Sequence, residues 1–167
     1  MACMEERIYN QVVEACADRL YRFACRLCRD ADAAADLVQD SFLKLWEYEY
    51  EVKNPVAFLY TVLCRAFTDA VRHGRLRERY AVEMAEVGLS EISRQGDRAM
   101  ERMEWRDYLA EVMEALPAIQ RTVLLLRDYE GYSYGEIGEM TGLHESQVKV
   151  YLFRARVKLK MMLQNRK

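Results

Sequence analysis

Apolar residues recur along most of this chain at the three- and four-residue spacing that places side chains on one face of a helix. This stripe predicts one helix over residues 5–29 and a second from residue 33 to about residue 50. A third helix begins at Pro55, because proline suits the first position of a helix and Asn54 can cap it. Gly74 suits the end of that helix, since glycine readily adopts the left-handed conformation that often terminates one.

A second apolar-rich block begins near residue 104 and is interrupted by Pro117, where one helix stops and another starts. Four of the seven glycines then lie between Gly131 and Gly142, which indicates tight turns between helices. The segment between the two blocks, residues 75–103, is polar and weakly periodic, and it is predicted to be partly helical. The expected fold is all-α, with two small helical domains joined by a linker: residues 1–78, 79–103 (the linker) and 104–167.

The last block contains a helix-turn-helix pattern. Ser133 and Glu136 form a capping box, in which each side chain satisfies a free backbone N–H group at the start of a helix. Gly142 ends that helix, and a second helix follows directly with Val148 facing the core. The side chains on the outer face of this second helix can reach base edges or phosphates in a major groove. They are Ser146, Lys149, Val150, Phe153 and Arg154.

The charges of the chain are sorted by segment. The net charge of the 167 residues is −2, which excludes a uniformly basic nucleic-acid binder. Residues 30–51 hold seven acids and one base, whereas residues 65–79 hold five arginines and two acids. Residues 144–167 hold seven bases and one acid. Two locally basic segments therefore lie at the ends of the two apolar blocks, which favours contact with a nucleic acid at both places.

Other kinds of chemistry have little support in the sequence. Five cysteines, an odd number, suit a reducing compartment such as the cytoplasm. Cys25 and Cys28 share a helix face, but a zinc site needs two further ligands that the sequence does not place nearby. No phosphate-binding loop, zinc-protease motif or nucleophile elbow is present, and the longest aliphatic run, Val123–Leu126, is too short to span a membrane. We therefore expect no enzymatic activity, no cofactor, no metal and no membrane insertion.

Five segments resemble a known family. Residues 134–143 (YGEIGEMTGL) and 147–156 (QVKVYLFRAR) resemble the promoter-reading domain of extracytoplasmic-function (ECF) sigma factors of the sigma-70 superfamily, and residues 116–127 are similar to its earlier helices. Residues 36–46 (DLVQDSFLKLW) resemble the helix with which this family binds the core of RNA polymerase. Residues 54–62 (NPVAFLYTV) resemble the segment that reads the −10 promoter element. The motifs occur in the order of the family and cover nearly the whole chain apart from the linker.

The resemblance implies a bacterial alternative sigma factor. Such a protein binds core RNA polymerase, recognises the −35 and −10 elements of promoter DNA and promotes transcription initiation in the cytoplasm, with no reaction of its own. It also implies an anti-sigma factor as a further partner. The alternative is a helix-turn-helix transcriptional regulator that binds duplex DNA without being a polymerase subunit.

The resemblance assigns the polymerase contact to one face of the helix over residues 36–46. Acidic and amide side chains with an apolar edge suit a basic, rigid partner surface. The assigned residues are Asp36, Gln39, Asp40, Leu43 and Trp46. For Trp46, packing in the protein's own core is an equal alternative, because a large aromatic side chain on a helix is usually buried.

The resemblance assigns the −10 contact to the loop before Pro55 and to the helix after it. A loop at a helix N-terminus can hold a phosphate, and aromatic or amide side chains can hold an unstacked base. The assigned residues are Lys53, Asn54, Phe58, Arg65, Thr68 and Arg72. The family usually has asparagine where Arg65 stands, and a small polar and basic pair where Val150 and Tyr151 stand, so its base preferences are not carried over at these positions.

Overall fold

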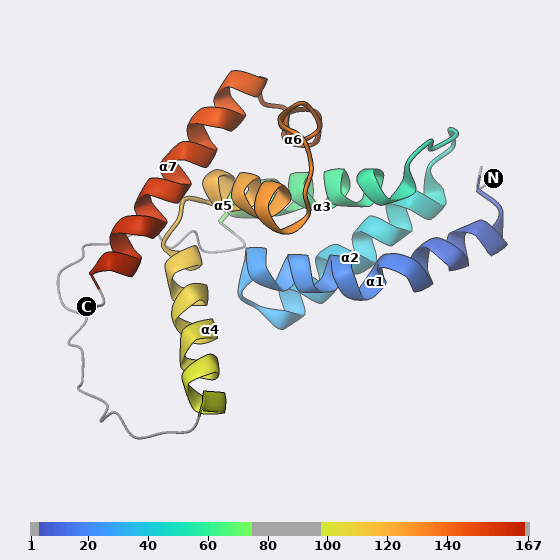
Figure 1. Cartoon of the computed structure of the whole chain (residues 1–167). Helices are drawn as coiled ribbons and strands as arrows, with labels where there is room; N and C mark the ends of the chain where they lie inside the picture. Colours follow the sequence, from blue (N-terminus) through green and yellow to red (C-terminus); the bar gives the residue numbers. More distant parts are fainter. Residues whose placement is uncertain (1–3, 75–97, 166–167) are drawn as a thin grey trace.

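The computed structural model describes residues 4–74 and 98–165, the second range without the side chains of residues 98–104. Every regular element in this part of the chain is helical, which confirms the predicted fold class (Figure 1). The elements are α1 (Glu6–Cys28), α2 (Ala31–Glu47), α3 (Pro55–Arg72), α4 (Arg98–Glu114), α5 (Ala118–Leu124), the π-helical segment η1 (Leu125–Tyr129), α6 (Tyr134–Thr141) and α7 (Glu145–Gln164). Most of the predicted linker, residues 79–103, lies outside the described residues, and α4 begins within its C-terminal end.

The helix ends of the first half are capped, and the caps at Asn54 and Gly74 are those that the sequence predicts. A carboxylate oxygen of Asp30 accepts hydrogen bonds from two backbone N–H groups in the first turn of α2, at 2.9 and 3.0 Å, so α2 starts earlier than residue 33. The Asn54 side chain accepts a hydrogen bond from the backbone N–H of Ala57 at 3.1 Å and caps α3. Gly74 follows the end of α3 with a φ of 70°, the left-handed conformation that glycine adopts without strain.

The predicted extension of the second helix to residue 50 is wrong. The backbone is already extended at Tyr48, which is the residue after α2. The Tyr48 ring packs against Tyr50 at a centroid distance of 5.7 Å and against Phe58 of α3 at 4.9 Å. These aromatic contacts hold residues 48–54 as a loop between the two helices and replace the helical turn that the apolar pattern suggested.

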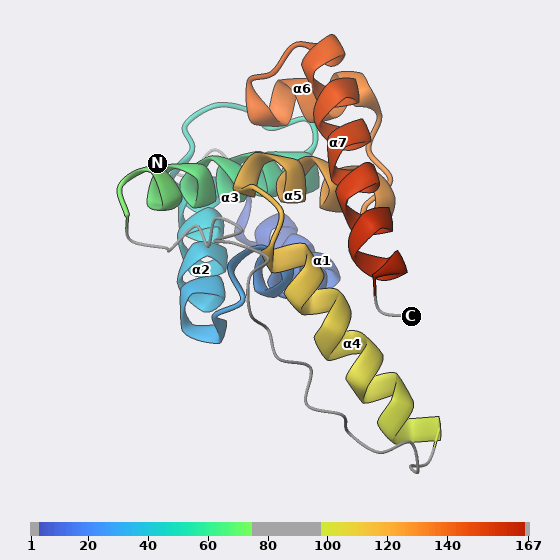
Figure 2. The same ribbon diagram turned by 90° about the vertical axis from the view of Figure 1, so that its left-hand side faces the viewer.

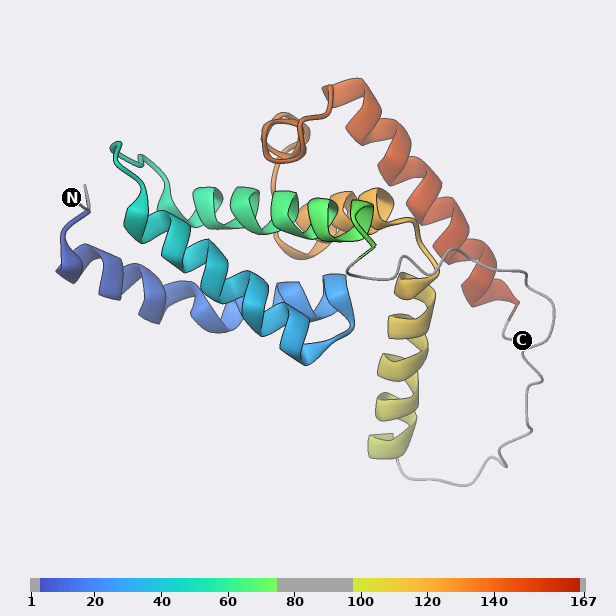
Figure 3. The same ribbon diagram turned by 180° about the vertical axis from the view of Figure 1, so that it is seen from behind.

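The first three helices form a bundle in which α1 and α2 are antiparallel and α3 lies across them (Figure 3). Each contributes a stripe of fully or almost fully buried side chains, as the helical spacing predicts. The stripes comprise Leu20, Phe23 and Leu27 of α1, Leu37, Phe42 and Leu45 of α2, and Leu59, Leu63 and Phe67 of α3. Because one face of α2 is committed to this core, its opposite face points away from the bundle.

The second half places a helix-turn-helix on α5. Ile137 and Met140 of α6, and Val148 and Leu152 of α7, are buried, as predicted. Figure 2 shows α6 and the start of α7 at one end of the molecule, with α7 running past α5 toward the end of α4. Helix α4 extends away from the bundle, joined to the rest at its C-terminal end.

The two halves pack against each other, and their buried residues form one continuous core. Figures 1 and 2 show α5 alongside α3, with α6 on the same side of it. Tyr60 of α3 connects the halves: its ring lies 5.0 Å from that of Phe23 in α1 and 5.6 Å from that of Tyr132 in the loop before α6. We call the contact of α1 and α3 with α5, η1 and this loop the interdomain seam.

Candidate nucleic-acid and protein interfaces

The outer face of α2 carries four of the five residues assigned to the polymerase contact. Asp36, Gln39 and Asp40 are exposed, and Leu43 beside them is 52% exposed, which is unusual for a leucine on a well-packed helix. The buried hydroxyl of Ser41 on the opposite face is satisfied within the helix, donating to the backbone carbonyl of Leu37 at 2.6 Å. The exposed side chains thus form an acidic, amide-containing strip with one apolar member, as predicted.

Trp46, the fifth residue of that assignment, lies at the edge of this strip. Its indole packs edge-on against Tyr9 of α1 at a centroid distance of 4.9 Å and is half-buried. Tyr9 is held in turn by its hydroxyl, which donates to the backbone carbonyl of Phe42 at 3.2 Å. Trp46 therefore helps to join α1 to α2 and leaves only part of its ring accessible.

A shallow cleft of about 530 Å³ lies between the end of α2 with the adjoining Tyr48 and the first half of α3. Tyr48 and the half-buried Phe58 form an aromatic wall, and Lys44 and Arg65 place two cations on the lining beside the carboxylate of Glu47. Aromatic faces with cations beside them are the features that hold an unstacked base and its phosphate. Sequence reasoning assigned Phe58 and Arg65 to this contact, but it did not place Lys44 here.

The six residues assigned to the −10 contact do not all remain available. Lys53, Arg65 and Arg72 are exposed. The Asn54 amide oxygen, by contrast, is used in the cap of α3. The Thr68 hydroxyl donates to the backbone carbonyl of Cys64 at 2.9 Å. The side chains of Asn54 and Thr68 thus each form a hydrogen bond with the backbone of α3.

A capping box at the start of α6 and two glycines near its end fix the geometry of the helix-turn-helix. The Glu136 carboxylate accepts the Ser133 N–H at 2.7 Å, and the Ser133 hydroxyl accepts the Glu136 N–H at 3.2 Å, which confirms the predicted capping box. The hydrogen bond from the Ser133 backbone lowers the pKa of Glu136. Gly142 has a φ of 74°, and at Gly138 the backbone passes so near that an added Cβ would lie 2.7 Å from the carbonyl oxygen of Leu143.

Helix α7 starts with a second, similar arrangement, in which the Gln147 side chain accepts the backbone N–H of His144 at 2.9 Å. The outer face beyond it is open to solvent: Phe153 is 69% and Val150 46% exposed, and the other three predicted residues are also exposed. Lys149 is paired with Glu145 at 2.9 Å on this exposed face. A shallow groove of about 190 Å³ runs along Ser146, Val150 and Arg154.

Other bases of α7 are tied to the protein itself. Arg156 pairs with Asp128 of η1 at 2.7 Å, and the Lys158 ammonium donates to the backbone carbonyl of Ala115 at 2.7 Å. Both contacts fasten α7 to the elements beneath it. The basic run at the end of the chain is therefore divided between residues that hold the helix and residues, such as Arg154, that face outward.

The interdomain seam contains polar residues that sequence reasoning missed. The Glu130 side chain is only 4% exposed, and its carboxylate accepts hydrogen bonds from Arg19 of α1 at 2.6 Å and from the Tyr60 hydroxyl at 2.9 Å. Burial, and then the hydrogen bond to Glu130, raise the pKa of Tyr60, so this hydroxyl remains a donor at neutral pH. Arg121 of α5 is buried and donates to the backbone carbonyl of Leu27 near the end of α1.

Among the described residues, no three His, Cys, Asp or Glu side chains are grouped so as to hold a metal ion. Burial, and then the neighbouring Cys25, raise the pKa of the Cys28 thiol to about 12, which opposes the thiolate form that metals bind. In the same part of the chain, no helix is long and apolar enough to cross a membrane.

Family models match both halves of the chain. The model for sigma-70 region 2 matches residues 12–77, which includes the candidate surfaces on α2 and α3. The model for sigma-70 region 4 matches residues 106–159, which includes the helix-turn-helix. Together the two matches cover about seven tenths of the chain, in the order that the sequence motifs predict.

Individual relatives agree with these matches. The chain is 29% identical to the ECF RNA polymerase sigma factor SigL of Mycobacterium tuberculosis, over 98% of this chain and 93% of the relative. It is 28% identical to RfaY of Xanthomonas campestris, described as a probable RNA polymerase sigma factor, over 96% of this chain but only 42% of that protein.

A solved structure of a sigma factor is also similar to this chain. The sigma factor RpoE of Bartonella quintana, in complex with the anti-sigma factor NepR, superposes with a TM-score of 0.69 at 26% identity, over 95% of this chain and 98% of that one. Sigma factors are not enzymes; they are transcription initiation factors that bind core RNA polymerase and promoter DNA. The paired region 2 and region 4 matches, together with these relatives, show that the chain belongs to the ECF group of sigma-70 family RNA polymerase sigma factors.

Proposed function

We propose that this sigma factor uses three separate surfaces: the outer face of α2 for core RNA polymerase, the start of α3 for the −10 element, and the outer face of α7 for the −35 element. The observation that carries the proposal is the exposure of functional side chains on helices whose opposite faces hold the core. Asp36 and Leu43 on α2, and Arg154 and Phe153 on α7, all point outward although apolar packing would bury the leucine and the phenylalanine.

For the polymerase contact, we propose that Asp36, Gln39 and Asp40 form charge-assisted hydrogen bonds to a basic surface of the core enzyme. Leu43 and the accessible edge of Trp46 add apolar area at one end of that contact. Opposite charges at such a rim mainly speed association and fix orientation, whereas a buried apolar member slows dissociation.

For the −10 element, the aromatic wall of the cleft at the start of α3 supports binding of an unstacked base. Phe58 and Tyr48 offer ring faces, and Lys53, Arg65 and Arg72 offer cations to the phosphates of the same strand. Stacking on an aromatic ring contributes about 1–3 kcal/mol per base with little dependence on its identity. The base preference must then come from polar groups at the rim, which Asn54 and Thr68 supply only in part because both also bond their own helix.

For the −35 element, we propose that Lys149 and Arg154 donate to guanine edges or to phosphates in the major groove. Val150 and Phe153 lie on the same exposed face and are suited to contact with a thymine methyl group, and Ser146 lies at the start of the helix. Few polar side chains face the bases, so we expect apolar contact with thymine to contribute more here than in a recognition helix with more polar groups.

We further propose a division into a region 2 domain (1–78), a linker (79–103) and a region 4 domain (104–167). A linker lets each weak DNA contact raise the effective concentration of the other once both domains are held on the polymerase. An anti-sigma factor as a partner is supported by the RpoE structure, which contains the anti-sigma factor NepR. We also propose that the protein acts in the cytoplasm, where promoter DNA and polymerase are found.

Run-off transcription with purified core polymerase tests the proposal. We expect the wild-type protein to direct initiation at a mapped promoter, and we expect Asp36→Lys to bind core polymerase more weakly in a competition assay for holoenzyme assembly. Glu14→Lys is a matched control, because Glu14 is an exposed acid on α1 outside the proposed contact. Equal assembly by Asp36→Lys and the wild type would contradict the assignment of this surface.

A second measurement separates a sigma factor from a helix-turn-helix regulator that acts alone. Each DNA-binding surface offers only a few phosphate contacts, and affinity falls by about 0.9 log unit per log unit of salt for each phosphate neutralised. The isolated protein should therefore bind promoter duplex weakly near physiological salt and tightly only with core polymerase. Tight, sequence-specific binding without the core enzyme would favour the regulator.

A further inference from the structure

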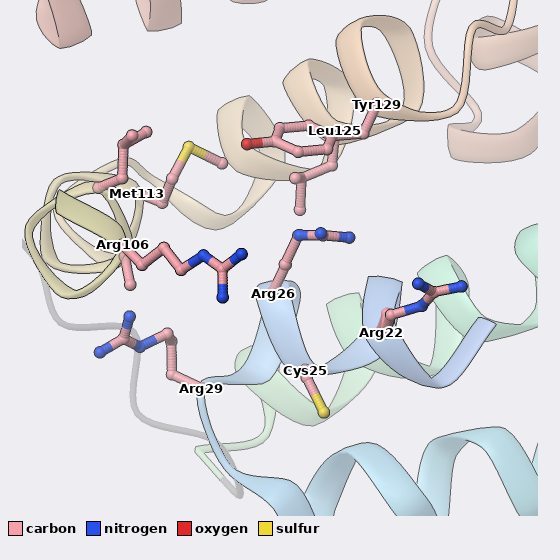
Figure 4. Close-up of a pocket in the computed structure, with 10 residues that line it drawn as sticks. Arg22, Cys25, Arg26, Arg29, Arg106, Met113, Leu125 and Tyr129 are labelled. Carbon is pink, nitrogen blue, oxygen red and sulfur yellow. The ribbon is translucent and has the colours of Figure 1, made fainter. Parts of the chain in front are cut away.

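A cavity of about 690 Å³ opens between α1 of the first half and α4 and η1 of the second, away from the three surfaces described above. Four arginines line it: Arg22 and Arg26 from successive turns of α1, Arg29 from the residue directly after α1, and Arg106 from α4. Figure 4 shows Arg26, Arg29 and Arg106 around one space, with Leu125 and Tyr129 of η1 on the opposite side.

Among the residues that the structure describes, the lining of this cavity has four guanidinium groups and no carboxylate. Around it, the Glu114 carboxylate lies 3.9 Å from Arg29, a long ion pair, and Arg22 donates to the backbone carbonyl of Asp18 at 3.3 Å. The Arg26 guanidinium lies over the Tyr129 ring at 4.7 Å. Guanidinium groups present paired N–H donors that match phosphate oxygens, so several of them around one space favour a ligand with more than one phosphate.

The remaining wall of the cavity is apolar. Leu109 and Met113 of α4 and Leu125 of η1 line it, together with the Tyr129 ring. A simple inorganic anion would leave this wall in water, whereas a ligand that joins phosphates to a flat, largely apolar group would cover it. The volume falls within the range of about 300–1,000 Å³ that small-molecule sites occupy.

We propose that this cavity binds a nucleoside polyphosphate, with its phosphates on the arginines of α1 and α4 and its base against the wall formed by Met113 and Tyr129. The site is formed by both halves of the chain, since α1 lies on one side of the seam and α4 and η1 on the other. A ligand that binds only the packed arrangement stabilises it in proportion to its occupancy. Bound nucleotide therefore strengthens the seam that Arg19, Glu130 and Arg121 already hold.

The proposal can be tested by calorimetry and thermal unfolding of the full-length protein with ATP or GTP in the absence of DNA and polymerase. We expect saturable binding with one ligand per chain and a rise in the unfolding midpoint. Adenosine and inorganic tripolyphosphate serve as the two partial ligands, and each should bind more weakly than ATP. Tripolyphosphate binding as tight as that of ATP would overturn the role of the apolar wall.

Substitutions locate the site. Arg26→Gln combined with Arg29→Gln should weaken ATP binding by about tenfold or more, the loss expected from one or two charge-assisted hydrogen bonds. Arg7→Gln removes an exposed arginine of α1 outside the cavity and should change nothing. Leu109→Glu adds a negative charge at a half-exposed position of the lining and should oppose the phosphates while leaving the helix folded.

The basic DNA-binding surfaces supply the main competing explanation for nucleotide binding. Arg154→Gln should therefore leave ATP affinity unchanged. Equal losses of affinity in Arg154→Gln and in the Arg26/Arg29 double variant would overturn the proposal, as would absence of binding at millimolar ATP. Binding of an acidic peptide that depends on Arg26 and Arg29, without binding of ATP, would overturn it in favour of a protein partner. None of these measurements involves transcription, so their outcome is independent of the proposed sigma activity.

Discussion

The two candidate DNA-reading helices, α3 and α7, differ in how far the side chains assigned to DNA contact are engaged within the protein itself. On α7, all five predicted side chains are exposed, and one of them, Lys149, is paired along its own helix. On α3 and the loop before it, Asn54 caps the helix, Thr68 bonds its own backbone and Phe58 packs against Tyr48. The cause is position in the fold. Helix α7 lies at the edge, whereas α3 is central, contacted by α1 and α2 on one side and by α5 and α6 on the other.

This comparison teaches that a central helix can give only part of its surface to a ligand. Residues at the start of α3 must form its cap and its contact with the α2–α3 loop, and any DNA contact must be compatible with these roles. An edge helix separates the two tasks, since its inner face packs and its outer face binds. Substitutions should therefore affect stability and binding together on α3, and separately on α7.

The largest expected effect comes from disrupting the turn that aims α7. An alanine Cβ at Gly138 would lie 2.7 Å from a backbone oxygen of Leu143, so the turn must shift. We expect Gly138→Ala to lower the free energy of unfolding by about 1–3 kcal/mol, as overpacking does, and to abolish −35-dependent transcription. Gly135→Ala is the matched control, because nothing lies within 4 Å of its added Cβ. If the two variants are equally stable in urea unfolding, the turn can shift to accommodate the added Cβ at little cost, and the close contact at Gly138 does not constrain it.

The next effect separates two arginines of α7 that are two residues apart. Arg154 faces outward, whereas Arg156 is paired with Asp128 at 2.7 Å. Arg154→Ala should cost about 1–3 kcal/mol of promoter binding in the holoenzyme if it contacts guanine, with the unfolding midpoint unchanged. Arg156→Ala should instead reduce stability by less than about 1 kcal/mol, the usual limit for an exposed ion pair, and leave promoter choice intact. If Arg156→Ala weakens promoter binding in a titration and Arg154→Ala does not, Arg156 is the DNA-contacting residue and the assignment of Arg154 is wrong.

Much of this contrast could be predicted from the sequence, because local signals specify it. The helical stripes, the proline at the start of α3 and the Ser133–Glu136 capping box all depend on neighbours within a few residues, and the structure confirms them. Exposure of the outer face of α7 follows from the same spacing. The −10 assignments were harder, because a polar residue such as Asn54 at a helix start has the same pattern whether it caps the helix or contacts DNA.

The interdomain seam could not be predicted. Arg19 and Glu130 are separated by more than a hundred positions, and nothing in their neighbourhoods distinguishes them from surface charges. In the sequence, Arg121 cannot be distinguished from an exposed arginine until its burial against the end of α1 is known. Long-range polar contacts of this kind depend on how helices pack, which periodicity does not specify. The arginine-lined cavity was missed for the same reason.

A smaller effect tests the double role of Asn54. Asn54→Ala removes the acceptor for the Ala57 N–H and should lower the free energy of unfolding by about 1 kcal/mol, the usual value for an N-cap. Asn54→Ser keeps a capping oxygen but shortens the side chain. We expect Asn54→Ser to retain most of the stability and to lose −10 function as far as Asn54→Ala does. If transcription by Asn54→Ser equals that of the wild type, the residue acts only as a cap.

The smallest expected effect is a pH dependence of stability. It should arise at the N-terminal cap of α6 and not at the caps of α3 and α7. The Ser133 backbone hydrogen bond lowers the pKa of Glu136 in the folded state, so its stabilisation is fully present above the unfolded pKa. It is lost as the pH falls through the lower, folded pKa. The corresponding acceptor at α7 is Gln147 and that at α3 is Asn54, neither of which titrates. The side-chain cap of α6 should therefore weaken in mild acid, while the amide caps of α3 and α7 do not.

Glu136→Gln is the variant that measures the pH-dependent stabilisation by the Glu136 cap, because glutamine can still accept the Ser133 N–H but cannot lose or gain this proton. Urea unfolding of both proteins between about pH 6 and about pH 3.5 should show the wild type losing stability faster than the variant, since carboxyl groups titrate in this range. Other carboxylates contribute equally to both curves and cancel in the difference. Parallel curves would mean that Glu136 is bonded as strongly in the unfolded chain as in the capping box.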